Sequence, residues 1–198
     1  MIDFTSDIKK YLQLLEKKLS VLNIQQINQI VNVIKSAYDN GNTIFTMGNG
    51  GSGTTASHIV CDFNKGASAG LVKKFKVICL NDNIPSLSAI ANDISYDMIF
   101  KEQLKNFLRP GDVVIGISTS GNSKNIIRAI EYAKRNGAVT IGLCGYDGGK
   151  LKKTAKYSIH VKVDDVKVTE DIHSIISHIM MKMLSAALMK PKSKKSKK

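Results

Sequence analysis

Apolar residues at helical spacing predict two helices at the N-terminal end of the chain. The first stripe is formed by Ile8, Leu12, Leu15, Leu19 and Leu22. The second ends at Asn40-Gly41 and is formed by Ile27, Ile30, Val31, Ile34 and Tyr38. Both stripes are too apolar to face water, so we expect the helices to pack on a sheet or on another subunit.

After Gly41 the pattern alternates between short apolar runs and amphipathic segments. The runs predict five strands, at residues 43–47, 75–80, 113–117, 139–143 and 157–161. The segments between and after them predict helices at 54–64, 86–94, 99–108 and 123–136, a short turn or helix at 148–155, and a long final helix at 168–189. The alternation predicts an α/β fold, a three-layer doubly wound sandwich with a five-stranded parallel sheet. Ligands of such sheets bind at the carboxyl ends of the strands.

Composition favours one soluble domain. The chain has 198 residues, 43% of them hydrophobic, with a net charge of +13. We expect a single domain over 1–189, followed by a disordered basic tail over 190–198 that carries six of the lysines. The charged N-terminus lacks a signal sequence and no apolar run reaches membrane-spanning length, so we expect a cytoplasmic protein with no membrane. No aromatic residues accompany the basic ones, which argues against specific nucleic-acid binding; the tail is either solubilising or a non-specific contact to acidic surfaces.

Three cysteines, Cys61, Cys79 and Cys144, lie far apart in apolar surroundings. Their number and spacing predict reduced core thiols and no structural zinc site.

The first candidate for chemistry is the glycine-rich segment 48–53, which follows the first predicted strand. It opens a helix whose N-terminus suits a phosphate, and that helix carries His58 and Asp62 on one face at i,i+4 spacing. Three interpretations stay open: a sugar-phosphate pocket with a catalytic or metal-binding pair, a dinucleotide site with Asp82 as the ribose acid, or a tight turn with a solvated ion pair.

A second candidate follows the third strand, where residues 118–123 read STSGNS. Four hydroxyls at the start of a helix suit a phosphate, whereas a helix N-cap needs only one. A dinucleotide fold does not need this loop, so the segment favours the sugar-phosphate interpretation.

The final helix carries a third group, Glu170, His173 and His178, beside an apolar stripe of Ile172, Ile175, Ile176, Ile179 and Met183. Glu170 and His178 are eight residues apart, about 12 Å along a helix. They share one metal only with both side chains stretched, or from different subunits; otherwise Glu170 holds a sugar hydroxyl. We interpret His160, on the fifth strand, as structural.

Several segments together resemble the phosphoheptose isomerases of the sugar isomerase (SIS) superfamily, over about residues 1–189. They are GNGGS at 48–52 with His58 downstream, ANDISY at 91–96, GDVVIGISTSGNSKNIIRAI at 111–130, GYDGGK at 145–150 and EDIHSIISH at 170–178. The resemblance implies a ketose–aldose isomerase that converts sedoheptulose 7-phosphate to D-glycero-D-manno-heptose 7-phosphate, at the head of nucleotide-activated heptose synthesis. It also implies a homotetramer with active sites between subunits, zinc in some members, and no nucleotide cofactor.

Carried over by motif, the substrate contacts are Asn49, Gly50, Gly51, Ser52, Asn92, Asp93 and Glu170, and the phosphate is held by Ser118, Thr119, Ser120 and Ser123. The metal ligands and acid/base groups are His58, Asp62, Glu170 and His178. The family has Glu at the position of Asp62 and Gln at that of Glu170. The resulting set of two carboxylates and two histidines suits a divalent metal.

Isomerisation needs a base over the reacting carbons, an acid for the carbonyl oxygen and a grip on the phosphate. We expect Asp62 to be the base and His178 its acid/base partner, with His58 and Glu170 binding a metal or orienting the sugar. Two rivals remain: an isomerase of another phosphosugar, and a non-catalytic SIS module that acts as an adaptor or sugar-phosphate sensor.

Overall fold

The computed structural model describes residues 1–189, so the predicted basic tail at 190–198 lies outside the described residues. Five parallel strands form one sheet: β1 (Ile44–Gly48), β2 (Val77–Cys79), β3 (Val113–Ser118), β4 (Val139–Cys144) and β5 (Tyr157–His160). All five predicted strands are confirmed, with small shifts at their ends. The strand order β2-β1-β3-β4-β5 reverses direction between β1 and β3, which pair in register from Ile44↔Val113 onward. The loops that follow β1 and β3 therefore flank the crevice where ligands of such sheets bind.

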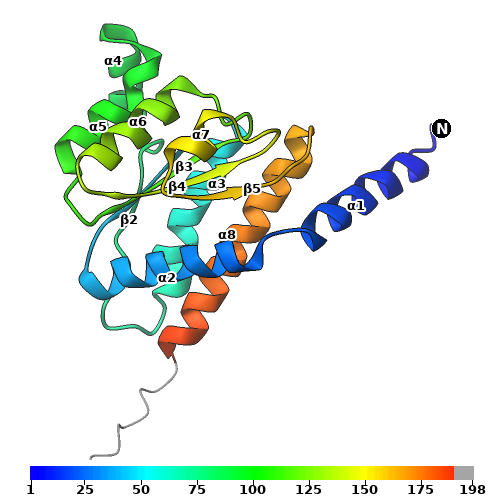
Figure 1. The fold of residues 1–198 in the computed structure, drawn as a ribbon, viewed down its shortest axis with the longest axis horizontal. Coiled ribbons are helices and arrows are strands. Elements are labelled where there is room, and N and C mark those ends of the chain that lie inside the picture. Colours follow the sequence, from blue (N-terminus) through cyan, green and yellow to red (C-terminus); the bar gives the residue numbers. More distant parts are fainter. Residues whose placement is uncertain (190–198) are drawn as a thin grey trace, which may run out of the picture.

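Helices cover both faces of the sheet, which confirms the three-layer architecture (Figure 1). One face packs against α2 (Ile24–Asn40), α3 (Gly51–Cys61) and α8 (Val166–Met189), and the other against α5 (Ile99–Phe107), α6 (Lys124–Arg135) and α7 (Gly149–Thr154). α4 (Ile84–Asp93) lies outside this second layer, next to α5. Alternate residues of each strand enter the two cores; Ile44 packs in the first and Phe45 in the second.

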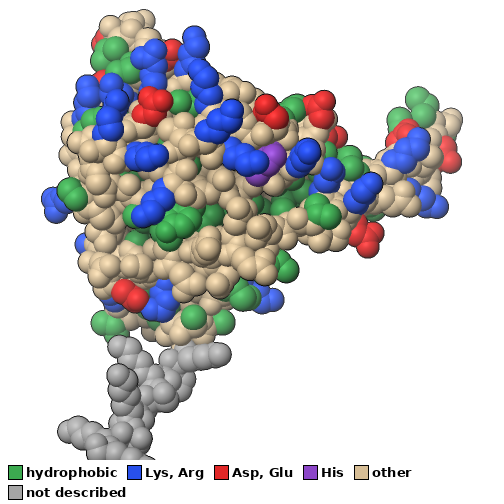
Figure 2. Space-filling model, viewed as in Figure 1, with side chains coloured by type: hydrophobic (Ala, Val, Ile, Leu, Met, Phe, Trp, Pro, Cys, Tyr) green, Lys and Arg blue, Asp and Glu red, His purple; other side chains and the backbone are tan. Residues whose placement is uncertain are grey.

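The two N-terminal helices differ in how they are packed. α2 buries Ile27, Ile30, Ile34 and Ala37 against the sheet. α1 (Thr5–Ser20) buries no residue and projects from the body, with Ile8 and Leu12 more than half exposed (Figures 1 and 2). Its contacts are with α8, where the Tyr11 hydroxyl donates to Asp171 Oδ2 at 2.5 Å and raises the pKa of Tyr11 to about 12.

The segment after β1 differs from the predicted one. α3 begins at Gly51, three residues earlier than expected, because Gly50 turns the chain at a φ of 52°. After Cys61 the chain continues without a break as a π-helix over Asp62–Ala67. Single π-helical turns inside helices are rare and are often found at functional sites.

The burial of α8 is also shifted relative to the predicted stripe. Ile172 and Ile176 are buried as expected, but Ile179 and Met183 are exposed and their places in the core are taken by Met180 and Leu184. α8 is the one helix within residues 1–189 long and apolar enough to span a membrane. Its buried side packs in the core against the sheet, which is the behaviour of a core helix.

Two of the three cysteines occupy the predicted core. Burial raises the pKa of the Cys79 and Cys144 thiols to about 11. The prediction for Cys61 is wrong, because its side chain is exposed on α3.

Candidate active site

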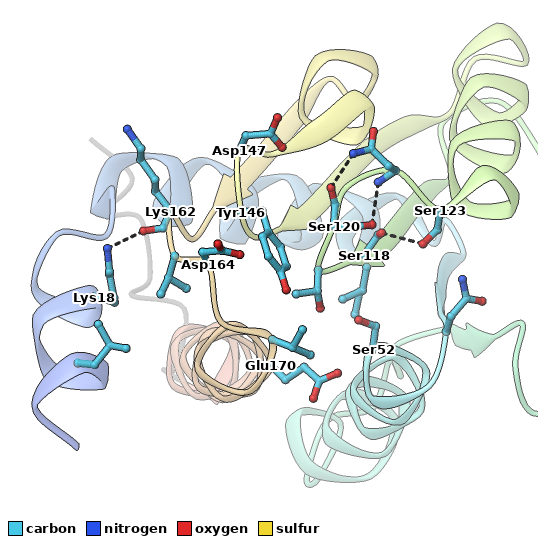
Figure 3. Close-up of a pocket in the computed structure, with 17 residues that line it drawn as sticks. Lys18, Ser52, Ser118, Ser120, Ser123, Tyr146, Asp147, Lys162, Asp164 and Glu170 are labelled. Atoms are coloured by element: carbon cyan, nitrogen blue, oxygen red, sulfur yellow. Dashed lines mark hydrogen bonds between the residues drawn. The ribbon is translucent and has the colours of Figure 1, made fainter. Parts of the chain in front are cut away.

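A cavity of about 1010 Å³ opens at the crevice beside the ends of β1 and β3 (Figure 3). Seven of the predicted substrate residues line it: Asn49, Ser52, Ser118, Thr119, Ser120, Ser123 and Glu170. The far side is formed by residues that sequence analysis did not assign to the site: Leu14 and Lys18 of α1, Tyr146 and Asp147 after β4, and Lys162 and Asp164 after β5. The residues of α1 and of 162–164 lie in segments without a motif, whereas Tyr146 and Asp147 belong to the GYDGGK segment, which supplied no predicted site residue.

The 118–123 loop forms one wall of the cavity. Ser123 stands at the N-cap position of α6, yet its side chain makes no capping hydrogen bond. Its Oγ instead lies 2.9 Å from Ser118 Oγ, which is buried at the end of β3. The hydroxyls are therefore paired with each other at the mouth of a helix, an arrangement suited to an anion rather than to a simple cap.

Gly121 holds this loop against its neighbour at a very short distance. Its φ is 64°, and a Cβ at this position would lie 2.1 Å from the Gly148 carbonyl oxygen. The Gly121 carbonyl accepts from Leu151 N at 2.9 Å, and Thr119 O accepts from Gly145 N at 2.8 Å. The loop is thus fixed by backbone contacts to the segment before and within α7, so only glycine fits at 121.

Asn49, directly after β1, lines the cavity near the start of α6. Its amide exchanges two hydrogen bonds with the amide of buried Asn125, at 3.0 and 2.9 Å, and its Oδ1 also accepts from the Tyr96 hydroxyl at 3.0 Å. Asn125 and Tyr96 orient Asn49; both lie in quoted segments, but sequence analysis gave neither a role, because a side chain that holds another side chain leaves no pattern of its own.

Glu170 is on α8, and its carboxylate lies at the N-terminus of α3. Its carboxylate packs against Gly51, where a Cβ would come within 2.3 Å of Oε1, and Lys167 Nζ lies 3.4 Å from Oε2. The N-terminus of α3, which the sequence suggested for a phosphate, therefore faces a carboxylate of the protein itself. A negative side chain there is favourable to the helix dipole, and it makes the 118–123 loop the better candidate for an anion site.

The metal-type cluster lies elsewhere on the same pair of helices. His58 Nε2 and His178 Nε2 are 2.9 Å apart, and the Asp62 carboxylate lies 3.6 Å from the first and 3.8 Å from the second. Ser177 Oγ donates to Asp62 Oδ2 at 3.4 Å. The Asp62 side chain is 12% exposed, whereas the two imidazoles are about half exposed.

The donor atoms of this cluster all lie within 4.8 Å of one another. Bonds of about 2.0–2.2 Å to a tetrahedral zinc would set them roughly 3.3 Å apart, so shifts of a few tenths of an ångström accommodate the ion. His58, Asp62 and His178 therefore fit a divalent metal with three protein ligands.

Glu170 lines the cavity but not the metal cluster, and other predicted residues join neither group within one chain. Glu170 lies outside the metal cluster, two helical turns from His178 along α8. Asn92 and Asp93 are exposed at the end of α4, where the Asn92 amide donates to Asp93 Oδ1 at 2.8 Å, and they do not line the cavity. Asp82, the candidate ribose acid, is exposed and also lies outside the cavity lining.

The other histidines of this region have different surroundings. His173 is fully buried in α8, and neither ring nitrogen has a well-formed hydrogen bond to any group within residues 1–189. Burial lowers the pKa of His173 to about 4. His160 has partners at both ring nitrogens, Tyr146 O at 2.9 Å and Lys152 Nζ at 3.0 Å.

The cavity, the hydroxyl loop and the cluster can be compared with known proteins. Residues 4–145 match the family model of the SIS domain. The chain belongs to the SIS domain family. Among curated relatives, the probable phosphoheptose isomerase of Thermoplasma acidophilum is 41% identical over 90% of this chain and 97% of its own length. The phosphoheptose isomerase of Thermodesulfovibrio yellowstonii is 37% identical over 87% and 86%.

A solved SIS structure shows the same fold. The phosphoheptose isomerase of Neisseria gonorrhoeae superposes with a TM-score of 0.83 at 26% identity, over 91% of this chain and 96% of that one. The resemblance to phosphoheptose isomerases drawn from the sequence motifs is therefore confirmed.

Proposed function

We propose that this SIS protein is a phosphoheptose isomerase, which converts sedoheptulose 7-phosphate to D-glycero-D-manno-heptose 7-phosphate. The observation that carries the proposal is that the fold provides the two parts that isomerisation needs. The 118–123 loop offers hydroxyls for a phosphate at the cavity, and the Asp62 carboxylate lies next to two imidazoles. The relatives named above support the same activity. This reaction is the first step of nucleotide-activated heptose synthesis, and we place it in the cytoplasm.

In this mechanism the 118–123 loop holds the phosphate and positions the far end of the sugar. Asp62 is the base that removes a proton from C1 of the ketose and returns it to C2. It is the least exposed member of the cluster, and Ser177 and the two imidazoles orient its carboxylate. His178, 3.8 Å from Asp62, delivers a proton to the C2 carbonyl oxygen and removes one from the C1 hydroxyl.

A zinc ion is the proposed resident metal, held by His58, Asp62 and His178. When bound, it would supply Lewis acidity near the carbonyl group, in place of the proton that His178 donates without the metal. Glu170 completes the predicted four-ligand set only from a second copy, because within one chain it lies about two turns away.

This leads to the proposed assembly, a homotetramer with active sites between subunits. The exposed apolar residues of α1 and α8, among them Ile8, Leu12, Ile179 and Met183, support such contacts. In the assembly the cavity of one chain faces the cluster of another, and Asn92 and Asp93 reach a site from a neighbouring copy.

The test is a conversion assay with purified protein on sedoheptulose 7-phosphate, fructose 6-phosphate and ribulose 5-phosphate. We expect the highest kcat/KM with the seven-carbon ketose. Preference for another sugar phosphate would support the rival isomerase, and tight sugar-phosphate binding with no turnover of any would support the non-catalytic module.

A further inference from the structure

Tyr146 has an unusual backbone conformation. It is the one non-glycine residue with a positive φ, 46°, within residues 1–189. Two glycines in the same turn, Gly148 and Gly149, also have positive φ. Bulky residues rarely adopt this conformation, and a turn that needed only its shape would use glycine again. A tyrosine held in a strained conformation beside a cavity points to a use for its side chain.

The backbone of Tyr146 is fixed from both sides. Its N–H donates to Val163 O at 3.1 Å and its carbonyl accepts from His160 Nε2 at 2.9 Å. Lys152 Nζ lies 3.0 Å from His160 Nδ1. Because a lysine ammonium only donates, His160 Nδ1 accepts and Nε2 carries the proton that is donated to Tyr146. The structural role expected for His160 is thus to hold this turn.

The preceding residue ties the turn to the phosphate loop. Gly145 N donates to Thr119 O, and a Cβ on Gly145 would lie 2.7 Å from the Thr169 side chain. Tyr146 therefore stands on a segment clamped between the loop and α8, with little freedom to move.

The side chain reaches the cavity. Figure 3 shows the ring projecting into it between the 118–123 loop and Glu170, with the phenol oxygen directed to the Glu170 side, away from Ser120 and Ser123. The hydroxyl makes no hydrogen bond to any group within residues 1–189. A half-buried phenol with an open hydroxyl in a polar cavity is a ready donor for a ligand hydroxyl.

We propose that Tyr146 is a sugar-binding residue that contacts the hydroxyl groups of the substrate chain rather than its phosphate, and that His160 and Lys152 are the positioning residues that hold it in place. The proposal rests on the proposed function only in the identity of the sugar phosphate. In this proposal the turn that carries Tyr146 recognises the hydroxyl groups of the sugar chain, between the 118–123 loop and Glu170.

The test compares Tyr146→Phe, which removes only the hydroxyl, with Tyr132→Phe on α6 as a control. Calorimetry measures the affinity for inorganic phosphate and for the tightest-binding of three ketose phosphates, and kinetics follow that sugar. We expect Tyr146→Phe to weaken sugar-phosphate binding about 3- to 10-fold, the worth of one hydrogen bond, with unchanged phosphate affinity. Tyr132→Phe should change neither.

Equal loss for phosphate and sugar phosphate, or no loss for either, would overturn the proposal. So would a wild-type protein that binds no sugar phosphate more tightly than phosphate itself. A wild-type protein that binds the sugar phosphate but does not turn it over would contradict only the isomerase activity, because the ratio of affinities still reports on Tyr146.

Three further variants separate positioning from folding. Tyr146→Gly relieves the strained φ, so we expect a melting temperature no lower than that of wild type together with the binding loss. At position 160, Gln retains an amide donor for Tyr146 O and Phe does not. We expect His160→Gln to keep a lower KM than His160→Phe, and equal KM values for the two would contradict the role of His160.

Discussion

The 118–123 loop and the His58–Asp62–His178 cluster are the two halves of the proposed site, and they are built differently. The loop is fixed by backbone hydrogen bonds and by the close approach of Gly121 to Gly148, all within one chain. The cluster consists of side chains from α3, the π-helix that continues it and α8, and its imidazoles are about half exposed. The binding half is therefore complete in one chain, whereas the chemical half is open to a partner.

The largest effect is expected at the cluster. Asp62→Asn keeps the shape of the side chain and removes the base, so kcat should fall on the order of a thousandfold. Calorimetry should show unchanged affinity for inorganic phosphate, because the loop is separate. A near-normal kcat would remove Asp62 from the mechanism.

Mixing two defective proteins tests whether the halves of one site come from different chains. Asp62→Asn and Gly121→Ala, co-expressed with separable tags at a 1:1 ratio, should regain activity in about a quarter of their sites if each site combines two subunits. The assay is run at low substrate concentration, where either variant alone is nearly silent. Activity no higher than the average of the two single variants would place cavity and cluster in one chain.

Gly121→Ala alone tests the binding half. The new Cβ would collide with the Gly148 carbonyl at a positive φ, so the loop must shift. We expect KM to rise about 10- to 100-fold, the loss of several hydrogen bonds to the phosphate. Zinc affinity at the cluster should stay within about twofold of wild type, and a parallel loss of zinc would show that the halves are coupled.

The smallest effect concerns the pH dependence of stability through His173. Its folded-state pKa of about 4 lies below the ordinary value of 6.5, so the unfolded chain takes up the proton first. Stability should be intact above pH 6.5 and fall as the pH is lowered toward 4, by on the order of 3 kcal/mol in total.

The variant His173→Leu should lose this contribution, because it removes the buried imidazole. Chemical denaturation of both proteins at pH 7 and pH 4.5 measures it. If the free energy of unfolding fell equally for the two proteins between pH 7 and pH 4.5, His173 would not be the source of the acid sensitivity.

The sequence was sufficient for the fold and for most of the loop and cluster. Helical and strand periodicity report on which side of an element is buried, and the i,i+4 spacing of His58 and Asp62 held because the helix continues through Cys61 into the π-helix. The same spacing argument left Glu170 and His178 able to share a metal only with stretched side chains or from different subunits, and the structure leaves Glu170 out of the cluster.

Other features left no readable signal. The proposed role of Tyr146 depends on its positive φ. Lys18 reaches the cavity through a long-range contact, in which its Nζ donates to the carbonyl of Lys162, 144 residues away. The exposure of Cys61 depends on which face of α3 it occupies, and its apolar neighbours in sequence do not show that. The early start of α3 follows from one turn at Gly50, which a run of glycines conceals.

The most direct test of the central claim is proton exchange at the reacting carbons. Wild type and Asp62→Asn are incubated with sedoheptulose 7-phosphate in D₂O, with and without chelator, and the sugar is followed by NMR. The account predicts deuterium at C2 of a new aldose with wild type, loss of that signal in Asp62→Asn, and reduced activity with chelator. No exchange by a wild-type protein whose phosphate site is demonstrably occupied would contradict the isomerase assignment.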